Sequence, residues 1–332
     1  MIVEKGMVKK GFVDKPVDPN VNLIEEINQM KKEKNAIILA HYYQTGDIQD
    51  IADFVGDSLA LSQKAAETDA DIILFAGVHF MAETAKILAP KSKVLIPDLN
   101  AGCSLADSCP PDEFKKFIEQ HPDHIVISYV NTTAQIKTMT DICCTSTNAL
   151  KIVEHLPKEQ KIIFAPDRNL GNYIKRVTGR ENMVIWDGAC HVHEEFSVEA
   201  ILELKKEYPN AKVISHPECK KPVQLISDFI GSTAALLKFT ETDDTKEYIV
   251  ATESGIIHQM KKQNAEKTYI VAPAKDSTCG CNDCNFMKLI TLKKIYNTLK
   301  FEQPEVILDE EVIKKAKKSI DTMLEISKKY NL

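Results

Sequence analysis

Cysteines carry the most distinctive chemistry in this chain of 332 residues. Three of its nine cysteines, Cys279, Cys281 and Cys284, fall within the short stretch DSTCGCNDCNFMK. Cys103, in DLNAGCSLAD, and Cys190, in WDGACHVHEE, also follow an apolar run by a short loop and also have small neighbours. Small residues let a thiolate approach a bulky inorganic ligand closely, so the pattern favours a metal or cluster site.

The spacing of these cysteines indicates three comparable units. Cys103 and Cys190 are 87 residues apart, and Cys284 lies 94 residues further on. Cys279 or Cys281 would fit this spacing about as well, so the spacing does not choose among the three. Three thiolates can hold a 4Fe-4S cluster by three of its irons, which leaves one iron open to polarise a substrate oxygen.

Two other arrangements of the same cysteines stay open at this point. One is a structural zinc bound by Cys279, Cys281, Cys284 and a histidine, although CxCxxC is not the usual spacing and no HxxxH lies nearby. The other is a redox pair of Cys281 and Cys284, whose thiol pKa a following helix would lower. We expect packing roles for Cys143, Cys144 and Cys219.

Short apolar runs rich in Ile and Val must position these residues. They lie at 36–43, 71–77, 93–98, 124–131, 161–167, 183–188, 212–218, 247–253 and 268–274. Such runs are typical of strands buried on both faces of a parallel sheet, and helical stretches follow them, notably 49–66. A last amphipathic helix is expected over 310–330. The alternation predicts an α/β fold with parallel sheets. Together with the cysteine spacing it is consistent with three similar αβα units, whose equivalent loops would meet on a pseudo-threefold axis.

In this architecture, ligands bind outside the carboxyl ends of the strands. Polar side chains gather at these ends: His41, Tyr43, His79, Asp98, Tyr129, Asn131, Asp167, Arg168, Asp187, His216, Glu218, Thr252 and Glu253. So many chemically capable ends indicate that several sheets present their ligand faces to one common space.

Composition narrows the class of protein. The chain is 44% hydrophobic and 27% charged, and its 42 basic and 48 acidic residues give a net charge of −6, which argues against general nucleic-acid binding. The longest apolar runs are far shorter than the ~20 residues that span a bilayer, and the N-terminal stretch has no apolar segment typical of a signal peptide. We therefore expect a cytoplasmic protein without a disulfide framework, with no membrane or nucleic-acid partner.

Ten motifs, in order over roughly residues 21–310, resemble those of the NadA-type quinolinate synthases of NAD biosynthesis. They are AHYYQ, ADFVGDSL, FMAE, SYVNTTA, CTSTNA, PDRNLG, GACHVHE, HPEC, IGST and CNFMK. Many motifs in the same order make the resemblance specific, where any one of them would be weak.

The resemblance implies a fold, a cofactor and a reaction. It implies three αβα domains, at 21–104 joined by 285–332, 105–190 and 191–284, after an extension at 1–20. It implies a 4Fe-4S cluster held by Cys103, Cys190 and Cys284, which leaves Cys279 and Cys281 as extra thiols. The implied enzyme condenses iminoaspartate with dihydroxyacetone phosphate to give quinolinate, phosphate and two waters.

The resemblance also implies roles for individual residues. The positions matching the family's ligand-binding residues are His41, Ser58, Tyr129, Asn131, Ser146, His216, Glu218, Ser232 and Thr233. The candidates for proton transfer are Tyr43, Glu218, His193 and His216. His191, beside a proposed cluster ligand, receives no role.

Three alternatives or additions accompany this interpretation. Another 4Fe-4S hydro-lyase acting on a small carboxylic acid would need guanidinium clamps, and Arg168, Arg176 and Arg180 are the only arginines. A non-enzymatic redox sensor that contains zinc or a cluster would need the cysteines but not Tyr43, His41 or Glu218. The lability of iminoaspartate suggests a transient contact with the enzyme that produces it.

Overall fold

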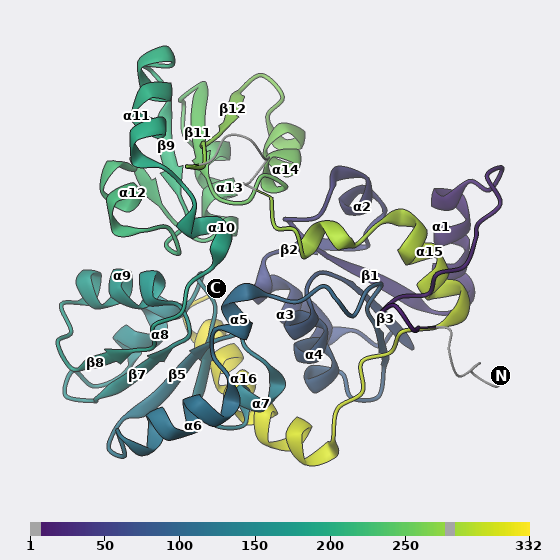
Figure 1. Cartoon of the computed structure of the whole chain (residues 1–332), viewed down its shortest axis with the longest axis horizontal. Helices are drawn as coiled ribbons and strands as arrows, with labels where there is room; N and C mark the ends of the chain where they lie inside the picture. Colours follow the sequence, from purple (N-terminus) through teal and green to yellow (C-terminus); the bar gives the residue numbers. More distant parts are fainter. Residues whose placement is uncertain (1–7, 276–282) are drawn as a thin grey trace. The chain divides into compact units, whose positions relative to one another are not determined.

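A computed structural model describes residues 8–275 and 283–332. The described chain divides into two compact units. Unit 1 takes the described residues of Met1–Cys103 together with Asn285–Lys314, and unit 2 takes those of Ser104–Cys284 together with Lys315–Leu332. Figure 1 labels the elements along the chain. Unit 2 contains two of the three sheets described below, so the three-domain boundaries stay a prediction.

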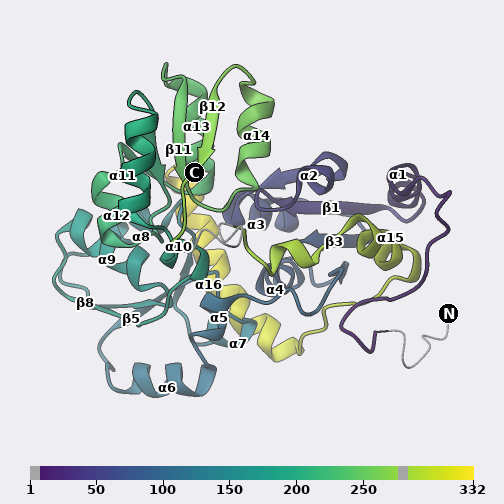
Figure 2. The same ribbon diagram turned by 45° about the horizontal axis from the view of Figure 1, so that its top comes forward.

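Unit 1 is built on one parallel sheet of strand order β2-β1-β3-β4. Its strands are β1 (Ala36–His41), β2 (Phe54–Gly56), β3 (Ile72–Ala76) and β4 (Lys93–Leu95). Its helices are α1 (Leu23–Glu33), α2 (Gly46–Ile51), α3 (Ser58–Glu67), α4 (His79–Leu88) and α15 (Leu292–Phe301), with a short 3-10 turn η1 (Met287–Leu289). Helices α1 and α15, far apart in the sequence, lie side by side (Figures 1 and 2).

Unit 2 repeats the same strand order twice, as β6-β5-β7-β8 and β10-β9-β11-β12. The strands of the first sheet are β5 (Ile125–Tyr129), β6 (Ile142–Cys144), β7 (Ile162–Ala165) and β8 (Met183–Ile185). Those of the second are β9 (Lys212–Ser215), β10 (Phe229–Ile230), β11 (Glu247–Ala251) and β12 (Thr268–Val271). The predicted α/β fold of three similar units with parallel sheets is confirmed, and each sheet has four strands.

Helices connect and cover these two sheets. Around the first sheet they are α5 (Ser104–Asp107), α6 (Pro111–Glu119), α7 (Ala134–Lys137), α8 (Ala149–His155) and α9 (Arg168–Thr178). Around the second they are α10 (His191–Glu194), α11 (Val198–Glu207), α12 (Lys221–Ile226), α13 (Thr233–Thr242) and α14 (Ile256–Gln263), the last running beside β12 (Figure 2). The expected last helix is α16 (Glu310–Lys329). No helix within 8–275 and 283–332 is long and apolar enough to cross a membrane.

The nine predicted strands are all present, but the predicted helix over 49–66 is wrong. The chain there ends α2, forms strand β2 and then begins α3. Phe54 pairs with Leu39 of β1, which requires extended backbone, and Asp57 caps α3 by accepting the N–H of Ala60 at 3.0 Å. The apolar spacing that suggested one helix belongs to the buried sides of three elements.

The short second strand of each sheet begins after an aspartate that fixes its register. Asp53 accepts the backbone N–H of Ile38, Asp141 that of Val126, and Asp228 that of Val213, each at 2.8 Å. A carboxylate that accepts a backbone N–H satisfies a donor on the strand next to it. The three sheets therefore share a side-chain contact as well as a strand order.

Candidate functional site

The sequence-predicted site residues occupy equivalent positions in the three sheets. The aspartate of each sheet accepts the N–H of a residue in the first strand, which is Ile38, Val126 or Val213. The third residue after this donor is His41, Tyr129 or His216. The fifth residue after the same donor is Tyr43, Asn131 or Glu218. A second set is found by counting from the aspartate itself, whose fifth following residue is Ser58, Ser146 or Thr233. All of these lie at or just after the carboxyl end of the first or second strand, where ligands bind in parallel sheets.

In unit 1, His41 and Tyr43 form a small local cluster. The N–H of Tyr43 donates to His41 Nδ1 at 3.2 Å, and the ring centroids are 4.4 Å apart at 74°. Lys288 Nζ donates to the carbonyl of Tyr43 at 2.7 Å. Because Nδ1 accepts a hydrogen bond, a neutral His41 carries its proton on Nε2 and can donate it to a ligand. Ser58 opens α3, directly after its capping aspartate.

In unit 2, Glu218 is the centre of a buried polar cluster. Its side chain is 4% exposed, and Tyr129 Oη donates to its Oε1 at 2.6 Å. His193 Nδ1 lies 3.2 Å from Oε2, and His216 Nδ1 lies 3.6 Å from Oε1. The N–H of Glu218 donates to His216 Nδ1 at 3.3 Å, the same contact that joins Tyr43 to His41.

Burial and charge set the protonation of this cluster. Burial lowers the pKa of His216 to about 3, although the Glu218 carboxylate works against it, so this ring is neutral at neutral pH. Burial raises the pKa of Glu218, but the His193 and His216 rings and the Tyr129 hydrogen bond outweigh it and hold this pKa at about 2. Glu218 is therefore ionised at neutral pH, and Tyr129 donates a hydrogen bond to its carboxylate.

His193 links this cluster to a cysteine. Its ring stacks on that of His216 with centroids 4.8 Å apart at 28°, and its Nε2 lies 3.0 Å from Thr252 Oγ1. Its Nδ1 faces the Glu218 carboxylate outside hydrogen-bonding geometry. Cys190, His193 and Glu218 each bring one ligand atom within 4.8 Å of the others, so these three side chains could hold a metal ion.

Exposure separates the described cysteines into two groups. Cys103, Cys190 and Cys284 are partly exposed, whereas the rest are fully buried: Cys109, Cys143, Cys144 and Cys219. Burial raises the pKa of all four buried thiols, that of Cys109 to about 12. A ligand thiol must be reachable and deprotonated, so the partial exposure of each of these three cysteines is compatible with its predicted ligand role. Cys279 and Cys281 lie outside the described residues.

Two buried carboxyl groups that the sequence analysis left without a role fix the backbone of the proposed ligands. Asp167 accepts the N–H groups of Leu170, Asn169 and Cys190. Glu253 Oε1 accepts the N–H of Cys284 at 3.1 Å. Both acids stand two residues past the third strand of their sheets, and that repeated spacing is the signal that could have identified them.

The pKa values of Asp167 and Glu218 are shifted in opposite directions. Burial and the charge of Glu218 raise the pKa of Asp167 well above its usual range, whereas the pKa of Glu218 is lowered. The Oδ2 of Asp167 has no hydrogen-bond partner among the described residues.

Hydroxyl and amide groups complete the site of unit 2. Ser232 caps α13 by accepting the N–H of Ala235 at 3.3 Å, and Thr147 Oγ1 donates to Ser232 Oγ at 2.8 Å. Thr233 is the first residue of this ten-residue helix, whose N-terminal N–H groups favour an anion. The Oδ1 of Asn131 is buried and has no hydrogen-bond partner in the described chain, so it can accept one from a ligand.

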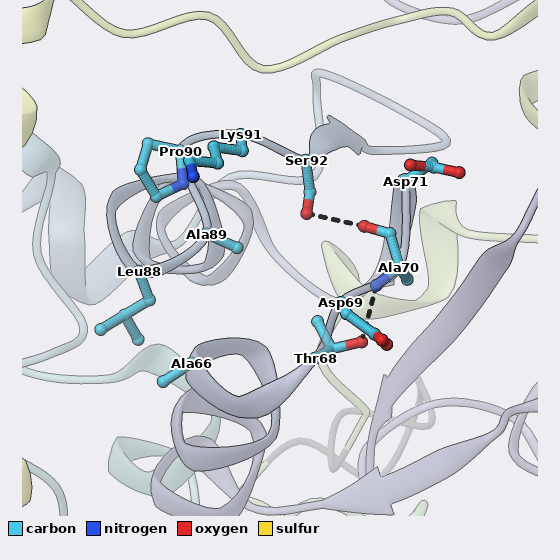
Figure 3. Close-up of a pocket in the computed structure, with 10 residues that line it drawn as sticks. All are labelled: Ala66, Thr68, Asp69, Ala70, Asp71, Leu88, Ala89, Pro90, Lys91 and Ser92. Atoms are coloured by element: carbon cyan, nitrogen blue, oxygen red, sulfur yellow. Dashed lines mark hydrogen bonds between the residues drawn. The ribbon is translucent and has the colours of Figure 1, made fainter.

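A cavity in unit 1 lies away from these residues. It holds about 500 Å³ and is lined by residues 66, 68–71 and 88–92, which precede β3 and β4 (Figure 3). Ser92 Oγ donates to the carbonyl of Ala70 at 2.7 Å at its wall. The cavity therefore faces the amino ends of the strands, and none of the sequence-predicted site residues lines it.

His191, which the sequence left unassigned, bonds within unit 2. Its Nδ1 lies 2.7 Å from Ser104 Oγ. Burial lowers the pKa of this half-buried ring. The contact joins the residue after Cys190 to the start of α5.

Comparison with known proteins gives one consistent family. The chain matches the family model described as quinolinate synthetase A protein over residues 25–325. It is 56% identical over 308 residues to a protein named quinolinate synthase from Chloroherpeton thalassium, covering 93% of this chain and 95% of that one. Proteins of the same name from Synechocystis sp. and Trichodesmium erythraeum are 58% and 55% identical, covering 92% and 98% of this chain and 96% and 99% of their own.

Proposed function

Because this chain belongs to the quinolinate synthetase A family, we propose that it is a quinolinate synthase of NAD biosynthesis. The proposed reaction condenses iminoaspartate with dihydroxyacetone phosphate to give quinolinate, phosphate and two waters. The observation that carries the proposal is the family match over residues 25–325, which spans all three sheets. We also propose three domains, 21–104 joined by 285–332, 105–190 and 191–284, each built on one sheet.

We propose that Cys103, Cys190 and Cys284 hold a 4Fe-4S cluster. Their partial exposure and the buried acids that accept the N–H groups of Cys190 and Cys284 support this assignment. When bound through three thiolates, such a cluster supplies one open iron as a Lewis acid.

The side chains around Glu218 are suited to proton transfer. The Glu218 carboxylate lies 3.2 Å from His193 Nδ1, and this pair is the proposed site of proton transfer in unit 2. His216, neutral and accepting at Nδ1, presents Nε2–H as a donor for substrate oxygen. Tyr43 is the proposed proton-transfer residue of unit 1.

The remaining residues bind the anionic substrates with little fixed charge. They are His41, Ser58, Tyr129, Asn131, Ser146, Ser232 and Thr233. Hydroxyl, amide and imidazole donors suit carboxylate and phosphate groups in a chain of net charge −6 with only three arginines. We expect the protein in the reducing cytoplasm, with transient contact to the enzyme that produces iminoaspartate.

Anaerobic reconstitution with iron and sulfide, followed by a quinolinate assay, tests the proposal. We expect Cys103→Ala, Cys190→Ala and Cys284→Ala each to lose the cluster and the activity. Glu218→Gln should keep the cluster and lose quinolinate formation, which a cysteine-based redox sensor would not predict. The control Cys143→Ala, at a buried thiol, should keep both. A colourless wild-type protein that binds one zinc would contradict the mechanism.

A further inference from the structure

The loop after the first strand of each sheet is tied down by the same contact. Gln49 Nε2 donates to the carbonyls five and seven residues before it, Gln44 at 2.8 Å and Tyr42 at 3.0 Å. Gln224 Nε2 donates at the same offsets to Cys219 at 2.7 Å and Pro217 at 2.8 Å.

In the middle sheet, Lys137 takes the place of glutamine. Its Nζ donates to the carbonyls of Thr132 at 2.5 Å and Val130 at 2.9 Å, again five and seven residues earlier. We name Gln49, Lys137 and Gln224 the bracket residues. They are 2%, 0% and 3% exposed, so water does not replace their contacts.

Each bracket residue straddles one residue of the proposed site. The carbonyls that it holds belong to the residues just before and just after Tyr43, Asn131 or Glu218. These loops lie past the ends of the strands, where the sheet ladder no longer holds the backbone. Two hydrogen bonds from one buried side chain fix the peptide planes on both sides of the residue between them.

We propose that Gln49, Lys137 and Gln224 are positioning residues, which orient Tyr43, Asn131 and Glu218 for the reaction. The proposal rests on the proposed function. Two of the three brackets use a neutral amide, so the shared feature is the pair of donated hydrogen bonds and not the charge of Lys137. Nothing in the family match or in the proposed site assigns these residues a role.

Two substitutions of Lys137 test the hydrogen bonds, one that removes them and one that introduces the glutamine found in the other two sheets. Lys137→Met removes both hydrogen bonds and keeps a long side chain, whereas Lys137→Gln restores the amide that the other two sheets use. Gln135→Met, on the exposed side of the same helix α7, is the control. Gln224→Met carries the same test in the third sheet.

The proposed roles of the straddled residues predict different kinetic effects. Asn131 is a proposed substrate-binding residue, so Lys137→Met should raise KM at least tenfold with a smaller change in kcat. Glu218 is a proposed base, so Gln224→Met should lower kcat at least tenfold. Lys137→Gln should return KM to within about threefold of wild type, and Gln135→Met should match wild type. Each rate is divided by the measured cluster content of the variant, so a lower cluster content does not by itself lower the rate.

Amide hydrogen exchange gives a readout that does not depend on the reaction. We expect faster exchange over residues 128–133 in Lys137→Met, with wild-type exchange in Lys137→Gln and Gln135→Met. An inactive wild-type protein with this exchange pattern would contradict the proposed function and leave the bracket established. Equal impairment of Lys137→Met and Lys137→Gln, or wild-type kinetics in both Lys137→Met and Gln224→Met, would overturn the positioning role. If Lys137→Met does not fold, the kinetics of Gln224→Met and its amide hydrogen exchange over residues 216–220 test the positioning role instead.

Discussion

The buried ring of His216 makes the stability of unit 2 depend on pH. Its pKa in the folded protein is about 3, lowered mainly by burial, against an ordinary value of 6.5. The unfolded chain therefore binds a proton on this ring at pH values where the folded chain does not. Stability from this ring is present above about pH 6.5 and is lost as the pH falls from there toward 3.

The magnitude follows from the separation of the two pKa values. Between pH 7 and pH 5, protonation of the unfolded ring lowers the free energy of unfolding by about 2 kcal/mol, since each pKa unit corresponds to about 1.4 kcal/mol. The ring is fully inside the protein, so solvent does not screen this effect. Glu218, whose pKa is also lowered, adds a loss of the same sign only below its ordinary value of 4.5.

Urea unfolding of the cluster-free protein at pH 7, 6 and 5 measures this loss. The single tryptophan, Trp186, lies in the same unit and packs edge-on against Phe114 and Phe117, so its fluorescence reports on that unit. His216→Gln should be less stable at pH 7 but should lose about 2 kcal/mol less than wild type between pH 7 and pH 5. His258→Gln, in α14, controls for the loss of an imidazole. Parallel pH profiles of wild type and His216→Gln would refute the reasoning.

Three further perturbations test separate contacts. Tyr129→Phe removes the 2.6 Å hydrogen bond to ionised Glu218 and should cost about 1.5–3 kcal/mol in urea unfolding at pH 7; a loss below about 0.5 kcal/mol would show that the bond adds no stability. Glu253→Ala frees the N–H of Cys284, and we expect less than half the wild-type iron per chain after gel filtration; wild-type iron content would contradict the anchoring role. Gly179→Ala places a side chain at φ +64° in open space and should cost about 1 kcal/mol of stability without changing quinolinate formation; unchanged stability would show that this strain is relieved.

The long buried strands could be predicted because their signal is local. Every residue of β3 and β7 is buried, and such strands read as continuous apolar runs. The short second strands β2, β6 and β10, of three, three and two residues, carry too few apolar positions to form a run. Their pairing depends on an aspartate contact to a neighbouring strand, which is a tertiary interaction.

In the site, too, the features with a local sequence signal could be predicted and the contacts between distant residues could not. Glu218 and Tyr129 could be placed at strand ends because an apolar run marks where a strand stops. Their hydrogen bond joins residues 89 positions apart, and the contact of His193 with Thr252 joins residues 59 apart. No local pattern encodes these pairings, so the sequence predicts candidate side chains and the fold decides which of them meet.

The three sheets keep the contacts that hold the backbone and vary the side chains that we propose bind ligands. The aspartate before the second strand is the same residue type in all three, and the bracket differs only where Lys137 replaces glutamine. At the strand ends the side chains diverge, to imidazole or phenol at one position and to phenol, amide or carboxylate at the other. The backbone N–H and C=O groups are the same in every sheet, so the same kind of side-chain contact can satisfy them in all three. The proposed reaction has two unlike substrates, and one set of side chains repeated three times would not suit both.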